Sequence, residues 1–147
     1  MTFPGLLADL VCPVLGAGVL AAPLLRKPRQ TPWLAWAQAA VTVGFVYLLT
    51  LADRAFGWWG SVGLDFSTHA GVAIALTISL GRCERRLRLP LALLLLAYAA
   101  LMIALRYHSA LDLVSSAAVV APVALLVPPR RGVSACGEIA SDNEERR

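Results

Sequence analysis

The sequence predicts an all-α membrane protein, a polytopic bundle of about five transmembrane helices. Of the 147 residues, 59% are hydrophobic and only 15% are charged, whereas soluble domains average roughly 45–50% apolar and about 25% charged residues. The apolar residues also form runs near the length of about 20 residues that a membrane-spanning helix needs. This composition excludes intrinsic disorder. The three cysteines lack the spacing of a disulfide framework or a metal site.

The first two helices are expected at about residues 5–25 and 33–52. Basic residues and prolines end the first helix, and no positively charged segment precedes it, which favours a membrane anchor over a cleaved signal peptide. The pair Asp53 and Arg54 ends the second helix. A loop rich in glycine and aromatic residues follows at 56–63.

The last three helices are expected at about residues 66–81, 91–107 and 108–127. The first of these is short, because its residues span only about 24 Å at roughly 1.5 Å per residue. Two prolines follow the last helix. Residues 1–128 are therefore expected to form a single transmembrane domain, and the polar segment 129–147 a disordered cytoplasmic tail.

The basic residues predict the orientation of these helices. Eleven of the thirteen Lys and Arg residues fall in the loop after the first helix, the loop after the third helix and the tail. Those segments share one side of the membrane if five helices alternate in direction, and loops rich in Lys and Arg face the cytoplasm. The N-terminus is therefore expected outside and the C-terminus in the cytoplasm. The net charge of +4 then reflects topology, and no nucleic-acid partner is expected.

Arg54 and Arg106 are the two basic residues that this topology leaves on the outer side. Cationic residues placed against the charge bias need a local partner. An anionic ligand would supply one. A carboxylate of Asp53, Asp65 or Asp112 would also do so, and both explanations stay open.

Both histidines of the chain, His69 and His108, are expected at the same outer interface. His108 and Asp112 are four residues apart, so on a helix they would share one face and the carboxylate could accept a ring N–H. Such a pair is half of a catalytic arrangement, although an ordinary polar contact between helices is the alternative. An aspartate inside a membrane helix suggests a functional role.

The segment Ser67-Thr68-His69 begins the third helix. Unpaired backbone N–H groups and the positive end of the helix dipole can hold an anion there. Alternatively, Ser67 or Thr68 caps the helix and His69 has no role. The polar groups of the helices thus converge on one interface, which favours a functional site.

These residues resemble the second and third motifs of the type 2 phosphatidic acid phosphatase (PAP2) superfamily. The similar segments are Ser67-Thr68-His69 and, later, Tyr107-His108 with Asp112, and the resemblance covers about residues 50–125. It implies that His108 is the nucleophile, that Asp112 orients it and that His69 is the general acid. The phosphate would be bound by Ser67, Thr68, Arg54 and Arg106.

The chain resembles a divergent member of this superfamily. Tyr47 and Ala55 stand where the first motif of the family has lysine and proline, Met102 stands where an arginine is usual, and Phe66 replaces a proline. The pattern is closer to the sphingomyelin-synthase-like lipid phosphotransferases, which keep two histidines and an aspartate with weaker basic motifs.

The predicted function is that of a membrane lipid phosphatase or headgroup phosphotransferase. It would cleave a lipid phosphoester at the outer membrane face through a phosphohistidine intermediate, while the lipid chains stay in the bilayer. No metal and no cofactor are expected, because no metal-ligand cluster is visible. Twelve arginines against one lysine are typical of a GC-rich bacterial genome, so the expected location is the bacterial cytoplasmic (inner) membrane.

The alternative is a non-catalytic protein of the same family that binds lipid or assembles with a partner. The small residues Gly71, Ala75 and Ser79, spaced by four, would allow close helix packing within the chain or in a homo-oligomer. A small transporter is disfavoured, because the charges lie at the interface rather than near mid-membrane.

Overall fold

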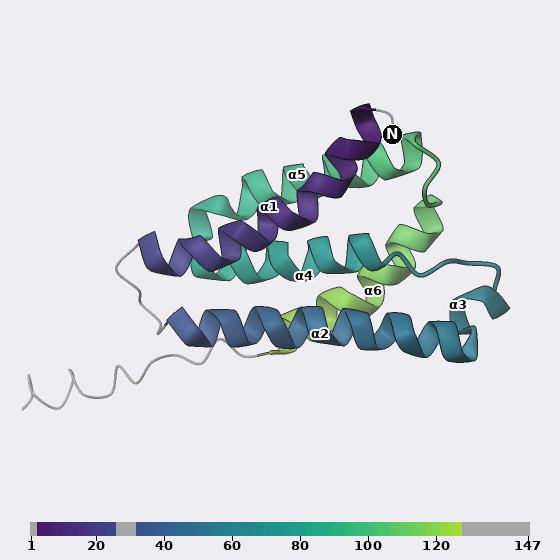
Figure 1. Cartoon of the computed structure of the whole chain (residues 1–147), viewed down its shortest axis with the longest axis horizontal. Coiled ribbons are helices and arrows are strands. Elements are labelled where there is room, and N and C mark those ends of the chain that lie inside the picture. The colour runs from purple at the N-terminus through teal and green to yellow at the C-terminus, as the bar shows by residue number, and fades with distance from the viewer. Residues whose placement is uncertain (1–2, 26–31, 128–147) are drawn as a thin grey trace, which may run out of the picture.

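The computed structural model describes residues 3–25 and 32–127, and every regular element within them is a helix (Figure 1). The predicted all-α fold is confirmed. The predicted tail at 129–147 lies outside the described residues. The elements are α1 (Phe3–Leu25), α2 (Pro32–Phe56), α3 (Trp58–Ser61), α4 (Thr68–Cys83), the 3₁₀ turn η1 (Arg85–Leu87), α5 (Arg88–Ala104) and α6 (Ala110–Leu126).

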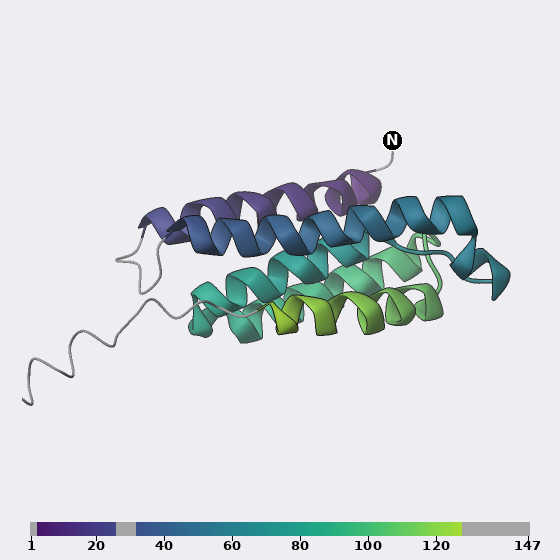
Figure 2. The ribbon, with the colours of Figure 1, turned by 90° about the horizontal axis from the view of Figure 1, so that it is seen from below.

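The five long helices run alternately in opposite directions, with α4 at the centre. α4 contacts α1, α2, α5 and α6, and Figure 2 shows α1 and α2 side by side along one side of the molecule. The end of α2, the start of α4 and the connection between α5 and α6 consequently lie at the same end (Figure 1). Residues 82–88 lie at the opposite end.

Small side chains explain why α4 can occupy the centre. Gly71, Ala73 and Ala75 are buried, and a Cβ atom placed on Gly71 would lie only 2.9 Å from a methyl carbon of Val46. The missing side chain therefore lets α2 approach α4 closely, as small residues do where helices pack without large side chains between them. Gly71, Ala75 and Ser79 are all buried within this chain.

Several helix boundaries differ from the predicted ones, and α5 begins and ends three residues earlier than expected. Two of the differences have clear local reasons. α2 continues to Phe56, one turn past the predicted end, and stops where Gly57 adopts a left-handed φ of 63°. α6 begins at Ala110 and not at His108, because Ser109 is its N-cap. The Ser109 hydroxyl accepts a hydrogen bond from the Asp112 N–H, and the Asp112 carboxylate accepts one from the Ser109 N–H.

Two stretches of the described chain, Trp36–Phe56 and Arg85–Ala104, are long and apolar enough to cross a membrane. The segment Leu10–Ala22 within α1 and the helix α6 (Ala110–Leu126) are also apolar but shorter. Large apolar side chains such as Leu48, Leu51 and Leu96 are more than 60% exposed. The two long helices therefore differ from the core helix of a soluble protein, whose apolar residues are mostly buried.

Candidate functional site

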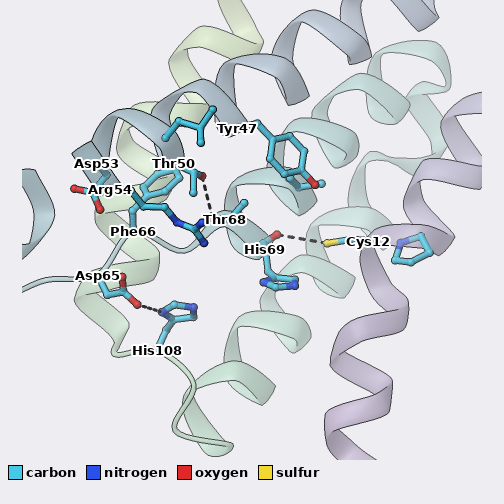
Figure 3. Close-up of a pocket in the computed structure, with 13 residues that line it drawn as sticks. Cys12, Tyr47, Thr50, Asp53, Arg54, Asp65, Phe66, Thr68, His69 and His108 are labelled. Carbon is cyan, nitrogen blue, oxygen red and sulfur yellow. Dashed lines mark hydrogen bonds and ion pairs between the residues drawn. The ribbon is translucent and has the colours of Figure 1, made fainter. Parts of the chain in front are cut away.

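A cavity of about 750 Å³ lies at the end of the bundle where α2 ends and α4 begins (Figure 3). This volume is within the range of about 300–1,000 Å³ that is usual for ligand sites. Its lining comes from α1, α2, α4 and two connecting segments: Cys12, Pro13, Tyr47, Thr50, Leu51, Asp53, Arg54, Asp65, Phe66, Thr68, His69, Val72 and His108.

The last two turns of α2 contribute a hydroxyl and a cation. Thr50 and Arg54 are four residues apart and both line the cavity, and Figure 3 shows the Arg54 side chain extending toward Thr68. The guanidinium makes no hydrogen bond or ion pair with another described residue. Its neighbour Asp53 instead accepts a hydrogen bond of 2.8 Å from the Trp59 N–H, which fixes the start of α3. Arg54 is therefore an exposed cation available to an anionic ligand.

At the start of α4, the two adjacent residues that were predicted to bind phosphate, Ser67 and Thr68, lie in different environments. Ser67 is fully buried, and its hydroxyl caps the helix by accepting from the Ala70 N–H. Ser67 also donates its own N–H to the Ser116 hydroxyl, at 3.0 Å. It does not line the cavity, so its hydroxyl is used to hold the fold. Thr68 does line the cavity and shares a hydrogen bond of 2.9 Å with the Thr50 hydroxyl.

His69 occupies the first turn of α4 and presents an exposed ring to the cavity. Its carbonyl oxygen accepts a hydrogen bond from the Cys12 thiol, with 3.5 Å between sulfur and oxygen, which ties this turn to α1. The N–H groups of Thr68 and His69 have no acceptor among the described residues. They add the partial positive charge of a helix start to this side of the cavity.

The predicted pairing of His108 with Asp112 does not form in the way that the spacing suggested. His108 precedes α6, so the two residues do not share a helix face. The Asp112 oxygens instead accept hydrogen bonds from the Asp65 N–H and the Ser109 N–H, each at 2.8 Å. Asp112 is buried and does not line the cavity. It holds the segment before α4 against the start of α6.

The carboxylate beside His108 is that of Asp65. The Nδ1 atom of His108 lies 3.7 Å from Oδ2 of Asp65, and both residues line the cavity. Residue spacing could not identify this pair, because the two residues come from different connections, before α4 and before α6. Their proximity depends on the Asp112 contact described above.

Arg106 is also separated from the predicted site. It lies in the connection between α5 and α6 with a left-handed φ of 55°, and it is exposed without lining the cavity. Of the two arginines predicted to bind phosphate, Arg54 alone is a cavity residue.

Sequence reasoning also missed how the residues 57–67 are anchored. The Trp59 indole N–H donates to the Ser115 hydroxyl at 3.0 Å, and its ring packs edge-on against Phe66 with 4.8 Å between centroids. Ser115 and Ser116 are adjacent on α6, and the hydroxyl of each accepts a hydrogen bond from this segment. Two adjacent serines in an apolar helix were the one available signal.

Within the described ranges, no group of three or more His, Cys, Asp or Glu side chains could hold a metal ion. The residues that line the cavity supply two imidazoles, one guanidinium, two carboxylates, three hydroxyls and one thiol, which is enough for nucleophilic and acid–base chemistry on an anion. No family model, curated protein or solved structure matches this chain.

Proposed function

We propose that the protein is an integral membrane enzyme that cleaves the phosphoester of a lipid, as a divergent member of the PAP2 superfamily. In this proposal His108 is the nucleophile and His69 the general acid, and Arg54 and Thr68 bind the phosphate. Asp112 and Ser67 have supporting roles in the fold, because both are buried and hydrogen-bonded outside the cavity.

The observation that carries the proposal is the convergence of three separated side chains on one cavity. His69, His108 and Arg54 come from α4, from the α5–α6 connection and from α2, and Figure 3 shows all three at the same cavity. Imidazoles and a cation without a carboxylate partner are the groups that phosphoryl transfer without a bound metal requires.

The reaction has two balanced steps. The His108 imidazole attacks phosphorus and the ester P–O bond breaks, while protonated His69 gives its proton to the departing alcohol oxygen. Water then attacks the phosphohistidine, the P–N bond breaks, and His69 takes the proton from that water. Arg54 stabilises the charge on the phosphoryl oxygens in both steps. A lipid alcohol in place of water would give headgroup transfer.

The shape of the cavity supports a lipid substrate. Its polar side chains gather at the end of α2 and the start of α4, whereas Tyr47 lies seven residues before Arg54, about 10 Å deeper along the helix at roughly 1.5 Å per residue. Tyr47, Leu51 and Pro13 also line the cavity and are exposed. A phosphate at the polar end could therefore have its chain run along apolar side chains of α1 and α2.

Five membrane spans, with the site at the outer face of a bacterial cytoplasmic membrane, complete the proposal. The described residues Arg82, Arg85, Arg86 and Arg88 lie at the end of the bundle opposite His69 and His108. Basic residues concentrate on the cytoplasmic side of membrane proteins, so the cavity end would face outward. Reporter fusions at the C-terminus that are active only in one compartment test this orientation.

The test is turnover by the full-length protein in detergent micelles with dioleoyl phosphatidate. We expect phosphate release by the unaltered protein, and its loss in His108→Ala and in His69→Ala. Arg85→Gln, at the opposite end of the bundle, is the control and should keep full activity. Wild-type turnover in both histidine variants would contradict the mechanism.

A lipid-binding protein without catalysis is the second candidate. The family resemblance implies that Ser67 and Asp112 are catalytic-site residues, but both form hydrogen bonds that hold the fold together outside the cavity. This difference favours the non-catalytic candidate. Binding of dioleoyl phosphatidate that requires Arg54, together with no release of phosphate, would establish this candidate and exclude the enzyme.

A further inference from the structure

We infer that Asp65 is the positioning residue of His108. Its carboxylate would accept the Nδ1–H of the imidazole and hold the ring in that tautomer, leaving the lone pair of Nε2 free to attack. The inference rests on the proposed function, in which His108 is the nucleophile. It assigns to Asp65 the role that the sequence spacing suggested for Asp112.

The environment of the His108 ring carries the inference. Its side chain is only 13% exposed, and its Nδ1 atom is buried without a hydrogen-bond partner among the described residues. Buried polar groups are nearly always hydrogen-bonded. A buried ring nitrogen without a partner therefore indicates that a nearby acceptor moves into hydrogen-bond distance when substrate binds. Oδ2 of Asp65 is 3.7 Å from this Nδ1 atom.

Asp65 is free to close this distance. Its side chain is 75% exposed, and its carboxylate forms no hydrogen bond with a described residue. A change in its side-chain torsion angles therefore breaks no existing contact. Catalytic hydrogen bonds are often long in ligand-free structures and shorten when substrate binds.

Asp112 does not take this role in the structure, because its carboxylate forms no hydrogen bond with His108. Both of its oxygens accept backbone N–H groups at 2.8 Å, and one of these belongs to Asp65 itself. Asp112 thus positions the backbone before α4, and Asp65, which lies in that segment, positions the imidazole ring of His108.

The direct test is the tautomer of His108, read from ¹⁵N NMR of the full-length protein in detergent at about pH 8.5, where an ordinary imidazole is neutral. The chain has two histidines, so His69→Gln assigns the signals and His69 provides the internal reference. We expect mainly the Nδ1–H form at His108, and a shift toward the Nε2–H form in Asp65→Asn. Glu84→Gln, an equivalent carboxylate-to-amide change at the other end of α4, should leave the tautomer unchanged.

A His108 ring that is mainly Nε2–H, or one unchanged by Asp65→Asn, would overturn the inference. With dioleoyl phosphatidate, Asp65→Asn should lower kcat about 100-fold while KM changes less than about threefold, because the carboxylate orients the nucleophile without touching substrate. An unchanged kcat would also overturn it. A tautomer shift in a protein that shows no turnover would support the Asp65–His108 pair and refute the proposed enzymatic function.

Discussion

The two ends of the helix bundle use arginine in different ways. At the end formed by residues 82–88, the Arg82 guanidinium donates to three carbonyl oxygens at the end of α6, and Arg88 donates to the Gly81 carbonyl. At the cavity end, Arg54 makes no such contact with a described residue. An arginine that caps a helix stabilises the fold, whereas an unpartnered one at a cavity is available for a ligand. Variants at the two ends should therefore separate effects on folding from effects on activity.

The largest effect that we expect separates the roles of His108 and His69. His69→Gln should slow phosphatidate cleavage about 10²- to 10⁴-fold, because an alkoxide leaves poorly without a proton donor. With 4-nitrophenyl phosphate, whose leaving group needs no proton, the same variant should release the first equivalent of 4-nitrophenolate nearly as fast as the unaltered protein. Later turnovers should be slower, because hydrolysis of the phosphohistidine also uses His69. His108→Ala should be inactive toward both substrates.

The rate of the first turnover with each substrate, measured in parallel for both variants, checks this assignment. A loss of first-turnover rate in His69→Gln that is equally large for the two substrates would show that His69 is not the general acid.

The next largest effect should come from the unpartnered arginine. Arg54→Gln should lower kcat/KM about 10- to 100-fold, since one cation acting on the phosphoryl oxygens is lost. Arg85→Gln, at the other end of the bundle, should leave kcat/KM unchanged. Steady-state kinetics of the two variants measures the difference, and equal effects would remove the distinction between the two ends.

Asp112→Asn should reduce stability by about 1–3 kcal/mol, because the new amide group would face a backbone N–H that now has an oxygen acceptor. Denaturation in detergent, followed by circular dichroism, measures this change. Glu84→Gln is the matched control, a carboxylate-to-amide change at the other end of the bundle, where the Glu84 carboxylate accepts a contact of 3.4 Å from the Arg86 N–H. A fully stable Asp112→Asn variant that has lost activity would instead favour a direct catalytic role.

The smallest expected effect concerns the arginine that caps α6. Arg82→Gln should cost about 1 kcal/mol of stability, because the carbonyl groups of Ala124, Leu125 and Val127 lose a charged donor. Its turnover at a temperature where the protein remains folded should be normal. Thermal denaturation and the phosphatidate assay measure the two quantities, and a normal melting temperature with reduced turnover would contradict the structural role.

The helices were predictable from the sequence because each is a long apolar run with clear interruptions. The apolar runs and the charged residues, prolines and glycines that end them predict the long helices α1, α2, α4, α5 and α6, and their approximate positions are confirmed. The boundary at His108 was wrong, because the Ser109–Asp112 capping box places the first helical residue at Ala110. Membrane insertion in the predicted orientation stays a prediction.

The site was predictable only in part. His69, His108, Arg54 and Thr68 were identified from residue type and helix position, and the structure brings them to one cavity. The partner of His108 was not identifiable, since the Asp65 contact joins two connections distant in the sequence and depends on a buried backbone hydrogen bond. Spacing along one helix reports only neighbours within that helix.

The close approach of α2 and α4 at Gly71 has a consequence for ligand selection. Their contact at Val46 lies about one turn from the Thr50–Thr68 hydroxyl pair, so backbone packing sets the separation of the two helices there. The cavity is then preformed, and a ligand loses less entropy than if it had to order the walls around itself. The size of residue 71 would thus limit the width of the headgroup that fits, from a position that the ligand never touches.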